Sequence, residues 1–169
     1  MSDYSQLIQH ADWQHSMETV PSFVSSWLNL SSSLTATLTQ TFGEVHVSVL
    51  SESWITFLND NERRFFPKKA ARFWCREVML KNQDTPLIFA RTLMPDSLLA
   101  QHIELQQLGN RALGEWLFMR PDRIRQRLEW TQDQATGLYA RRALMQIGQE
   151  SMVVAELFLT PRIFTRTIK

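Results

Sequence analysis

The sequence predicts an α+β fold in a single domain, with a mainly antiparallel sheet of about six strands and helices packed on one face and beside the loops. Three observations support this prediction. Several runs alternate apolar and polar residues, short polar links join consecutive runs, and leucines recur at helical spacing. The 169 residues, 44% hydrophobic and 21% charged, suffice for one core. We expect one domain over residues 1–169, in which a lead at 1–20 and a basic tail at 162–169 are peripheral.

Two helices are expected before the first strand. Pro21 suits the first position of a helix in "PSFVSSWLNL", and a second helix should follow in "SLTATLTQTF" until Gly43 ends it. The alternation in "EVHVSVL" then predicts a half-buried strand. We expect "SWITFL" to be a partner strand and "NDNERRFFPKK" to be a loop.

A hairpin, two short helices and a meander are expected in the rest of the chain. The polar link "NQDT" between "RFWCREVMLK" and "PLIFARTLMP" predicts an antiparallel pair. The segment "DSLLAQHIELQQLGNRALGEWLF" predicts two short helices around a turn at Gly109 and Asn110. Short links predict a three-stranded meander from "DRIRQRLEWTQ", "GLYARRALMQI" and "SMVVAELFL".

Composition argues against several classes of function. A net charge of +1 gives no field that would draw the protein to nucleic acid. No segment offers the roughly 20 apolar residues that span a bilayer, so stable membrane insertion is not expected. The four histidines are scattered away from Cys75 and predict no metal site. A single cysteine suits a reducing compartment, and we expect a cytoplasmic protein.

Three charged residues lie inside apolar strands. Glu156 is the only charge in "SMVVAELFLT", where burial requires a strong partner, a raised pKa or an adjacent polar cavity. Arg76 in "FWCREVML" and Arg91 in "LIFARTLM" are cations among hydrophobic residues. The hairpin register is not fixed by the sequence, so whether the two arginines share a face stays open.

Two interpretations of these charges remain open. In the structural one, Glu156 pairs with one of the two arginines, or all three residues lie at strand ends near water. In the functional one, they line a closed pocket for a small anion, where arginine binds a carboxylate and glutamate accepts a hydrogen bond from a hydroxyl. Elsewhere, "RPDRIRQRLEW" places Arg123, Arg125 and Arg127 on one strand face, which could contact phosphates but is better explained as a solvated face.

A family resemblance rests on an ordered set of motifs between about Pro21 and Pro161. The runs "RFWCREVML", "ARTLMP", "LQQLGNRALGEWLF", "GLYARRALMQI" and "VAELFL" resemble the chorismate pyruvate-lyase family. The resemblance implies a six-stranded antiparallel sheet and helical flaps over an internal site. It also implies conversion of chorismate to 4-hydroxybenzoate and pyruvate for ubiquinone synthesis, without a metal or organic cofactor. We expect a monomer.

The resemblance also implies roles for individual residues. Arg76 would bind the ring carboxylate, and Glu156 would contact the ring hydroxyl, so both are expected to be catalytic. The backbone N–H groups of Leu34 and Leu113 would help to hold the ring carboxylate, and Arg91 would face the second carboxylate. Whether Glu156 acts as a base or only orients the ring stays open.

The sequence departs from the family pattern at two positions. Leu34 stands where a member of the family has methionine, and Ala112 stands where proline is usual. Loss of that proline predicts a looser chain before Leu113. The alternative function is a non-catalytic effector-sensing domain that binds a small aromatic acid. A purely structural interaction domain is disfavoured by the three charges inside apolar strands.

Overall fold

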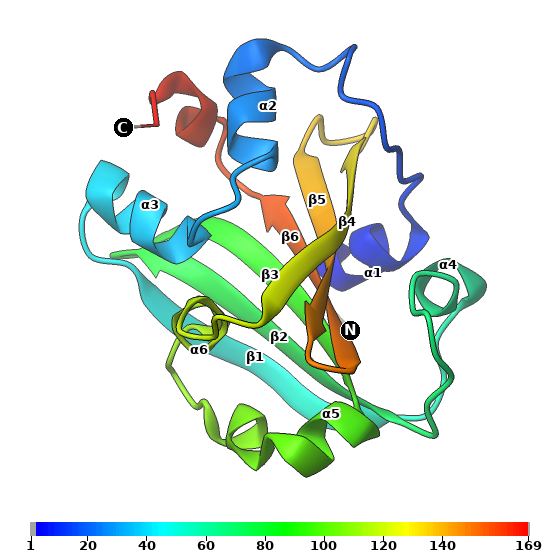
Figure 1. Ribbon diagram of the computed structural model, residues 1–169. Helices are drawn as coiled ribbons and strands as arrows, with labels where there is room; N and C mark the ends of the chain where they lie inside the picture. The colour runs from blue at the N-terminus through cyan, green and yellow to red at the C-terminus, as the bar shows by residue number, and fades with distance from the viewer. Residues whose placement is uncertain (1–2, 169) are drawn as a thin grey trace.

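One antiparallel sheet organises the computed structural model, which describes residues 3–168. Met1, Ser2 and Lys169, the ends of the predicted domain, lie outside the described residues. Within residues 3–168 the sheet has six strands in the order β1-β2-β3-β6-β5-β4, so the predicted α+β fold with a six-stranded antiparallel sheet is confirmed (Figure 1). The strands are β1 (His46–Ile55), β2 (Phe73–Asn82), β3 (Thr85–Pro95), β4 (Arg123–Gln132), β5 (Tyr139–Ile147) and β6 (Glu150–Phe158).

The predicted β2–β3 hairpin and the β4–β5–β6 meander are both present, whereas residues 44–66 differ from the prediction. The two runs predicted there as separate strands form one strand, β1. Its pairing with β2 is irregular between Val49 and Ser51, and this interruption broke the alternation in the sequence. The expected loop contains a helical turn, α4 (Asp60–Arg63), because the Asn59 side chain caps it by accepting a hydrogen bond from the N–H of Glu62 at 2.9 Å.

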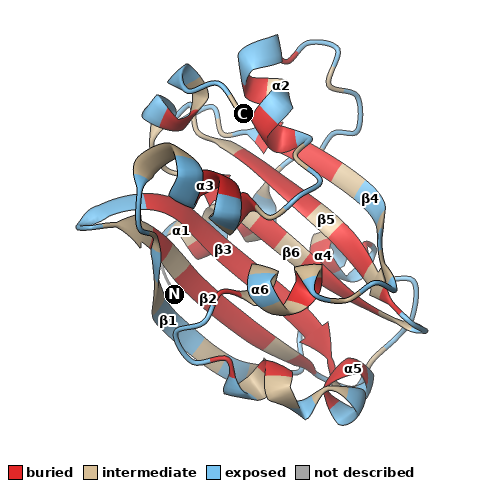
Figure 2. Cartoon of the chain, turned by 60° about the vertical axis from the view of Figure 1, so that its left-hand side comes forward, coloured by how far each residue is buried: buried red, intermediate tan, exposed pale blue. Residues whose placement is uncertain are grey.

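One face of the sheet carries most of the helices (Figure 2). The predicted helices α2 (Ser22–Leu28) and α3 (Leu34–Phe42) pack on it through Trp27 and Leu38, which are fully buried. Gly43 ends α3 with φ at 94°, a conformation that glycine adopts without strain. At the other end of this face lie α5 (Asp96–Gln101), the 3₁₀ helix η1 (Ile103–Gln107) and α6 (Leu113–Phe118).

Two helices lie on the opposite face, which the sequence did not predict. Ile8 of α1 (Asp3–His10) packs against Phe89 and Leu157, and α4 bonds to β3 on the same side. Residues predicted as a peripheral lead therefore cover part of the sheet. The tail is also docked, because η2 (Pro161–Thr165) buries Ile163, and the indole of Trp27 donates a hydrogen bond to the carbonyl of Arg166 at 3.0 Å.

Candidate active site

A mainly apolar cavity of about 100 Å³ lies between the sheet and the first turns of α3 and α6. This space exceeds by several times the roughly 15 Å³ that one ordered water needs by the same measure. Five strands, the segment between α2 and α3 and the first turn of α3 contribute polar side chains to its lining. These residues are Ser31, Ser32, Thr35, Arg76, Thr92, Arg125, Arg141 and Glu156.

Strand pairing brings the cavity residues together. Glu156 of β6 pairs with Ala90 of β3 on one side and with Arg141 of β5 on the other. One step along, Arg76 of β2 pairs with Thr92 of β3. Because side chains alternate between the two faces, all five point to the side covered by α3 and α6. The structure thus brings the predicted Arg76 and Glu156 to one cavity.

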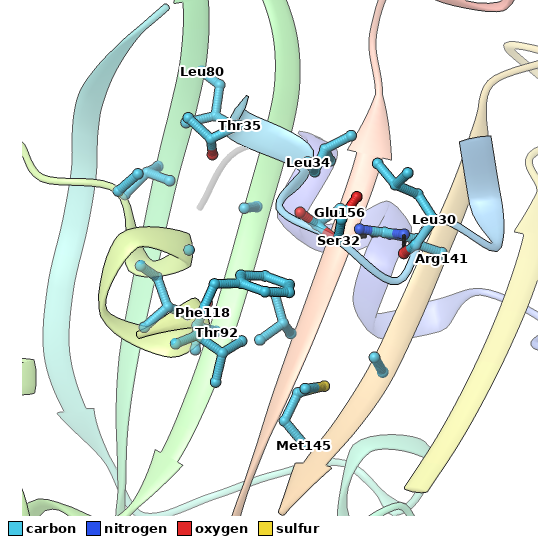
Figure 3. Close-up of a pocket in the computed structure, with 18 of the residues that line it drawn as sticks. Leu30, Ser32, Leu34, Thr35, Leu80, Thr92, Phe118, Arg141, Met145 and Glu156 are labelled. Atoms are coloured by element: carbon cyan, nitrogen blue, oxygen red, sulfur yellow. Dashed lines mark hydrogen bonds and ion pairs between the residues drawn. The ribbon is translucent and has the colours of Figure 1, made fainter. Parts of the chain in front are cut away.

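Glu156 has an arginine partner that the sequence analysis did not identify. Its Oε1 accepts a hydrogen bond from Nε of Arg141 at 2.8 Å, and the two side chains are 15% and 9% exposed. Nη1 of Arg141 also donates to the carbonyls of Leu28 and Leu30 at 3.3 and 2.8 Å. Figure 3 shows Arg141 and Glu156 side by side, with Leu30 and Ser32 next to them. The sequence did contain a pattern that could have identified Arg141. The alternation in "YARRALM" places it on one strand face with Ala143 and Met145, which also line the cavity.

Arg76 anchors the turn before α6. Its Nη2 donates to the carbonyls of Gly109 and Arg111, each at 2.9 Å, and the side chain is 2% exposed. Nη1 lies 3.2 Å from Oε2 of Glu52, but neither atom has a hydrogen-bond partner among the described residues. This contact is therefore an ion pair without a well-directed hydrogen bond, and Nη1 keeps an unused donor.

Leu34 and Leu113 are the first residues of α3 and α6, and both line the cavity. Backbone N–H groups in the first turn of a helix have no carbonyl partner within that helix. The side chain of Ser33 caps α3 by accepting from the N–H of Ala36 at 3.1 Å. Ala112, which stands where proline is usual in the family, has φ at −72°, close to the value that proline imposes.

The two helix starts lie against each other. A Cβ atom added to Gly114 would lie 3.4 Å from Oγ of Ser33 and 3.8 Å from Oγ1 of Thr35. Gly114 and Thr35 also line the cavity. The close approach of α6 to α3 therefore covers this side of the cavity.

Arg91 does not join this group, which corrects the prediction that it faces a second carboxylate in the same pocket. It pairs with Glu77 of β2 and projects from the opposite face of the sheet. There its guanidinium binds both carboxylate oxygens of Glu62, at 2.8 and 2.9 Å, and Oε2 of Glu77 at 3.0 Å. Nη1 also lies 3.0 Å from Sγ of Cys75, and burial raises the pKa of that thiol to about 12. Burial disfavours the charged form of Arg91, yet the bonds to Glu62 raise its pKa.

The three arginines of β4 do not share one face, contrary to the prediction. The pairing with β5 shifts by one residue between Arg125 and Arg127. As a result, Arg125 lines the cavity, whereas Arg127 lies over the ring of Phe65. Arg125 donates to the carbonyls of Leu30 and Asn29 at 3.0 and 3.2 Å. Burial lowers its pKa, and the positive charge of Arg141 lowers it further.

The lining therefore holds more positive than negative charge, with Arg76, Arg125 and Arg141 against Glu156. Among residues 3–168, no group of histidine, cysteine, aspartate and glutamate side chains could hold a metal ion. The same part of the chain contains no helix long and apolar enough to cross a membrane.

Fold and site define a class: a small α+β domain with an arginine-lined cavity between an antiparallel sheet and short covering helices. Residues 7–169 match the family model described as chorismate lyase, and the chain belongs to this family. It is 70% identical to a protein of Pasteurella multocida (strain Pm70) named "Probable chorismate pyruvate-lyase", over 100% of both chains. It is 30% identical to the chorismate pyruvate-lyase of Pectobacterium atrosepticum, over 93% of this chain and 89% of that one.

A solved structure of a domain from a repressor shares the fold. The C-terminal domain of the histidine utilization repressor from Pseudomonas syringae aligns with a TM-score of 0.52 at 10% identity, over 75% of this chain and 96% of that one. At this level of identity the similarity concerns the fold only.

Proposed function

We propose that the protein is a carbon–oxygen lyase that converts chorismate to 4-hydroxybenzoate and pyruvate. The observation that carries this proposal is that one mainly apolar cavity contains two polar sites. Arg76 on β2 forms one site, and the ion pair between Glu156 on β6 and Arg141 on β5 forms the other. A cation and an acceptor separated by apolar walls suit a flat ring that carries a carboxylate at one end and a hydroxyl at the other. Membership of the chorismate lyase family supports the same substrate.

In this proposal, Arg76 binds the ring carboxylate through its unused Nη1 donor. The N–H groups of Leu34 and Leu113, at the starts of α3 and α6, would bind the same carboxylate. Glu156 would accept a hydrogen bond from the C4 hydroxyl, and Arg141 would compensate the charge of this carboxylate. These contacts fix the ring at both ends, which favours one reactive geometry.

The reaction breaks the ether bond between ring carbon C3 and oxygen, removes the hydrogen from C4 and makes the ring aromatic. In one route, Glu156 takes the C4 hydrogen as a proton while the ether electrons leave with enolpyruvate, which then gains a proton to become pyruvate. In the other, the hydrogen passes directly to the enolpyruvyl methylene as the ether opens, and Glu156 only orients the ring. Both routes balance without a metal, an oxidant or an organic cofactor.

The proposal extends to the cellular role. The product would enter ubiquinone synthesis as the aromatic head group, and the protein would act in the cytoplasm as a monomer. The short helices α3 and α6 would serve as flaps that open to admit chorismate and to release 4-hydroxybenzoate.

The direct test is incubation of the purified protein with chorismate in buffer that contains a chelator. We expect equimolar 4-hydroxybenzoate and pyruvate, well above a control without protein. Absence of both products would contradict the lyase proposal.

A second candidate is a sensor domain that binds a small aromatic acid without turnover. It is favoured by the fold similarity to the C-terminal domain of a repressor. Tight binding of 4-hydroxybenzoate together with no product from chorismate would support this candidate.

A further inference from the structure

Two guanidinium groups converge on one backbone oxygen at the edge of the cavity. Nη1 of Arg141 and Nη1 of Arg125 donate to the carbonyl of Leu30 at 2.8 and 3.0 Å. The two arginines come from neighbouring strands, β5 and β4, and both line the cavity. Glu156, bonded to Arg141, is thus near a second cation that the reaction described above does not use.

Arg125 differs from the other arginines of the cavity in its partners. Arg141 pairs with Glu156, and Arg76 lies 3.2 Å from Glu52. Within residues 3–168, Arg125 forms no ion pair with a carboxylate, and it donates hydrogen bonds to the neutral carbonyls of Leu30 and Asn29. A partly buried cation without a counter-charge is destabilising, and a bound anion would offset that cost.

The substrate chemistry places an anion at this end of the cavity. Chorismate carries its enolpyruvyl ether on C3, the carbon next to the one that bears the C4 hydroxyl. If Arg76 binds the ring carboxylate and Glu156 the hydroxyl, the second carboxylate lies at the Glu156 end. Arg91 cannot reach it from the opposite face of the sheet.

We propose that Arg125, supported by Arg141, binds the second carboxylate of the substrate and so distinguishes substrate from product. The inference rests on the proposed lyase function and adds a residue to the same site. The product 4-hydroxybenzoate lacks this carboxylate, so Arg125 has an anionic partner only before the pyruvate leaves. The cavity should therefore bind the product less tightly than a ligand that carries both carboxylates.

Arg125 also holds residues 29–30 of the segment that precedes α3, so a purely structural role needs to be separated from substrate binding. Comparison of the substrate with the product separates the two roles. If Arg125 binds the second carboxylate, its substitution weakens the binding only of ligands that carry this carboxylate. If Arg125 only holds the covering segment, its substitution weakens the binding of every ligand.

The experiment measures kcat and KM for chorismate and Kd for 4-hydroxybenzoate in the Arg125→Gln variant. We expect kcat/KM to fall by roughly 100-fold while Kd for the product changes by less than about threefold. Arg127→Gln is the matched control, because Arg127 is on the same strand but over Phe65 on the other face, and both constants should stay near wild type.

Three results would overturn the proposal: an unchanged kcat/KM in Arg125→Gln, an equal loss for substrate and product in a folded variant, or the same losses in Arg127→Gln. If Arg125→Gln does not fold, the wild-type protein provides the test. 3-(Carboxymethoxy)-4-hydroxybenzoate should inhibit at least about tenfold more strongly than its neutral amide, and equal inhibition would overturn the proposal. An inactive wild-type protein would instead contradict the lyase function.

Discussion

Arg76 and Arg91 lie on facing strands of one hairpin, yet their side chains project from opposite faces of the sheet. At the turn, Asn82 pairs with Thr85, and continuation of this register would place Arg76 directly opposite Arg91. The pairing shifts by one residue between Leu80 and Lys81, so Arg76 instead faces Thr92. One irregular position in the strand pairing therefore assigns the two arginines to different environments.

For Arg91 we predict a role in stability. Arg91→Met would leave Glu62 and Glu77 buried without their shared cation, so the free energy of unfolding should fall by about 3 kcal/mol or more. The affinity of the folded protein for 4-hydroxybenzoate should remain near wild type. Urea unfolding and calorimetric titration provide the two measurements. Wild-type stability combined with a large loss of kcat/KM would restore a role for Arg91 in substrate binding.

For Arg76 we predict a role in binding and turnover. Arg76→Ala removes the cation from the cavity and the bonds to the carbonyls of Gly109 and Arg111. Kd for 4-hydroxybenzoate should rise, and kcat/KM for chorismate should fall, each by about 100-fold or more. Arg111→Ala is the control, since it keeps the carbonyl that Arg76 binds while removing a nearby exposed side chain. Near-normal catalytic efficiency of Arg76→Ala would contradict the assignment.

For Glu156 we predict that the carboxylate matters more for turnover than for product binding. Gln at this position can still accept the hydrogen bond from Arg141, so the cavity should keep its shape. A fall in kcat of about 100-fold with product affinity nearly retained would indicate a chemical role. Single-turnover kinetics separates chemistry from release, and an unchanged rate of the chemical step would remove Glu156 from the mechanism.

The buried thiol of Cys75 predicts a dependence of stability on alkaline pH. Its pKa is about 12 in the folded protein against a reference value of 9.0, because burial disfavours the thiolate. Between these values the unfolded chain releases the proton and the folded chain keeps it, so the free energy of unfolding should fall as pH rises. Its stabilising contribution is fully present below about pH 9.

The measurement compares urea unfolding of the wild type and Cys75→Ala at about pH 8 and about pH 10.5. Other titrating groups are common to both proteins, so the difference between them isolates the thiol. We expect the wild type to lose more stability than the variant over this interval. Equal losses would show that burial does not shift the pKa of Cys75.

The close approach of α6 to α3 at Gly114 predicts how substitutions at this position change the rate of product release. A Cβ atom at this position would be in ordinary contact with Ser33 at 3.4 Å, so Gly114→Ala should release product at the wild-type rate. The two additional methyl groups of Gly114→Val would push the helices apart, and product release should accelerate by about tenfold. Stopped-flow dissociation of 4-hydroxybenzoate measures these rates. Equal rates for the Ala and Val variants would show that this contact does not gate release.

Much of the secondary structure could be predicted because the patterns were local. The hairpin link "NQDT" and the short links after β4 and β5 predicted which strands are adjacent. The pairing of β3 with β6 had no local pattern, since more than 50 residues separate the two strands. The short helix α4 also escaped prediction, because the Asn59 cap sits in a segment that otherwise resembles a loop.

The candidate site was also predictable only where the sequence pattern was local. Glu156 and Arg76 were identified as charges in apolar strands, and both line the cavity. The sequence left the β2–β3 register open, and the family resemblance alone assigned Arg91 to the site; a shift of one residue in that pairing places it on the opposite face. Alternation grouped Arg125 with Arg127, and a shift of one residue in the β4–β5 pairing separates them. Alternation along a single strand carries no information about such shifts, which arise only when two strands pair.

The position of β6 between β3 and β5 has a consequence for synthesis of the chain on the ribosome. While the nascent chain grows, β3 exposes an unpaired hydrogen-bonding edge through the synthesis of α5, α6, β4 and β5. Such an edge can pair with another chain, and newly made copies on one polysome are near neighbours. Before β6 is synthesised, the residues around β3 therefore have to limit pairing of this exposed edge with other chains. Chaperones that recognise apolar extended segments would bind the nascent chain at "PLIFARTLMP".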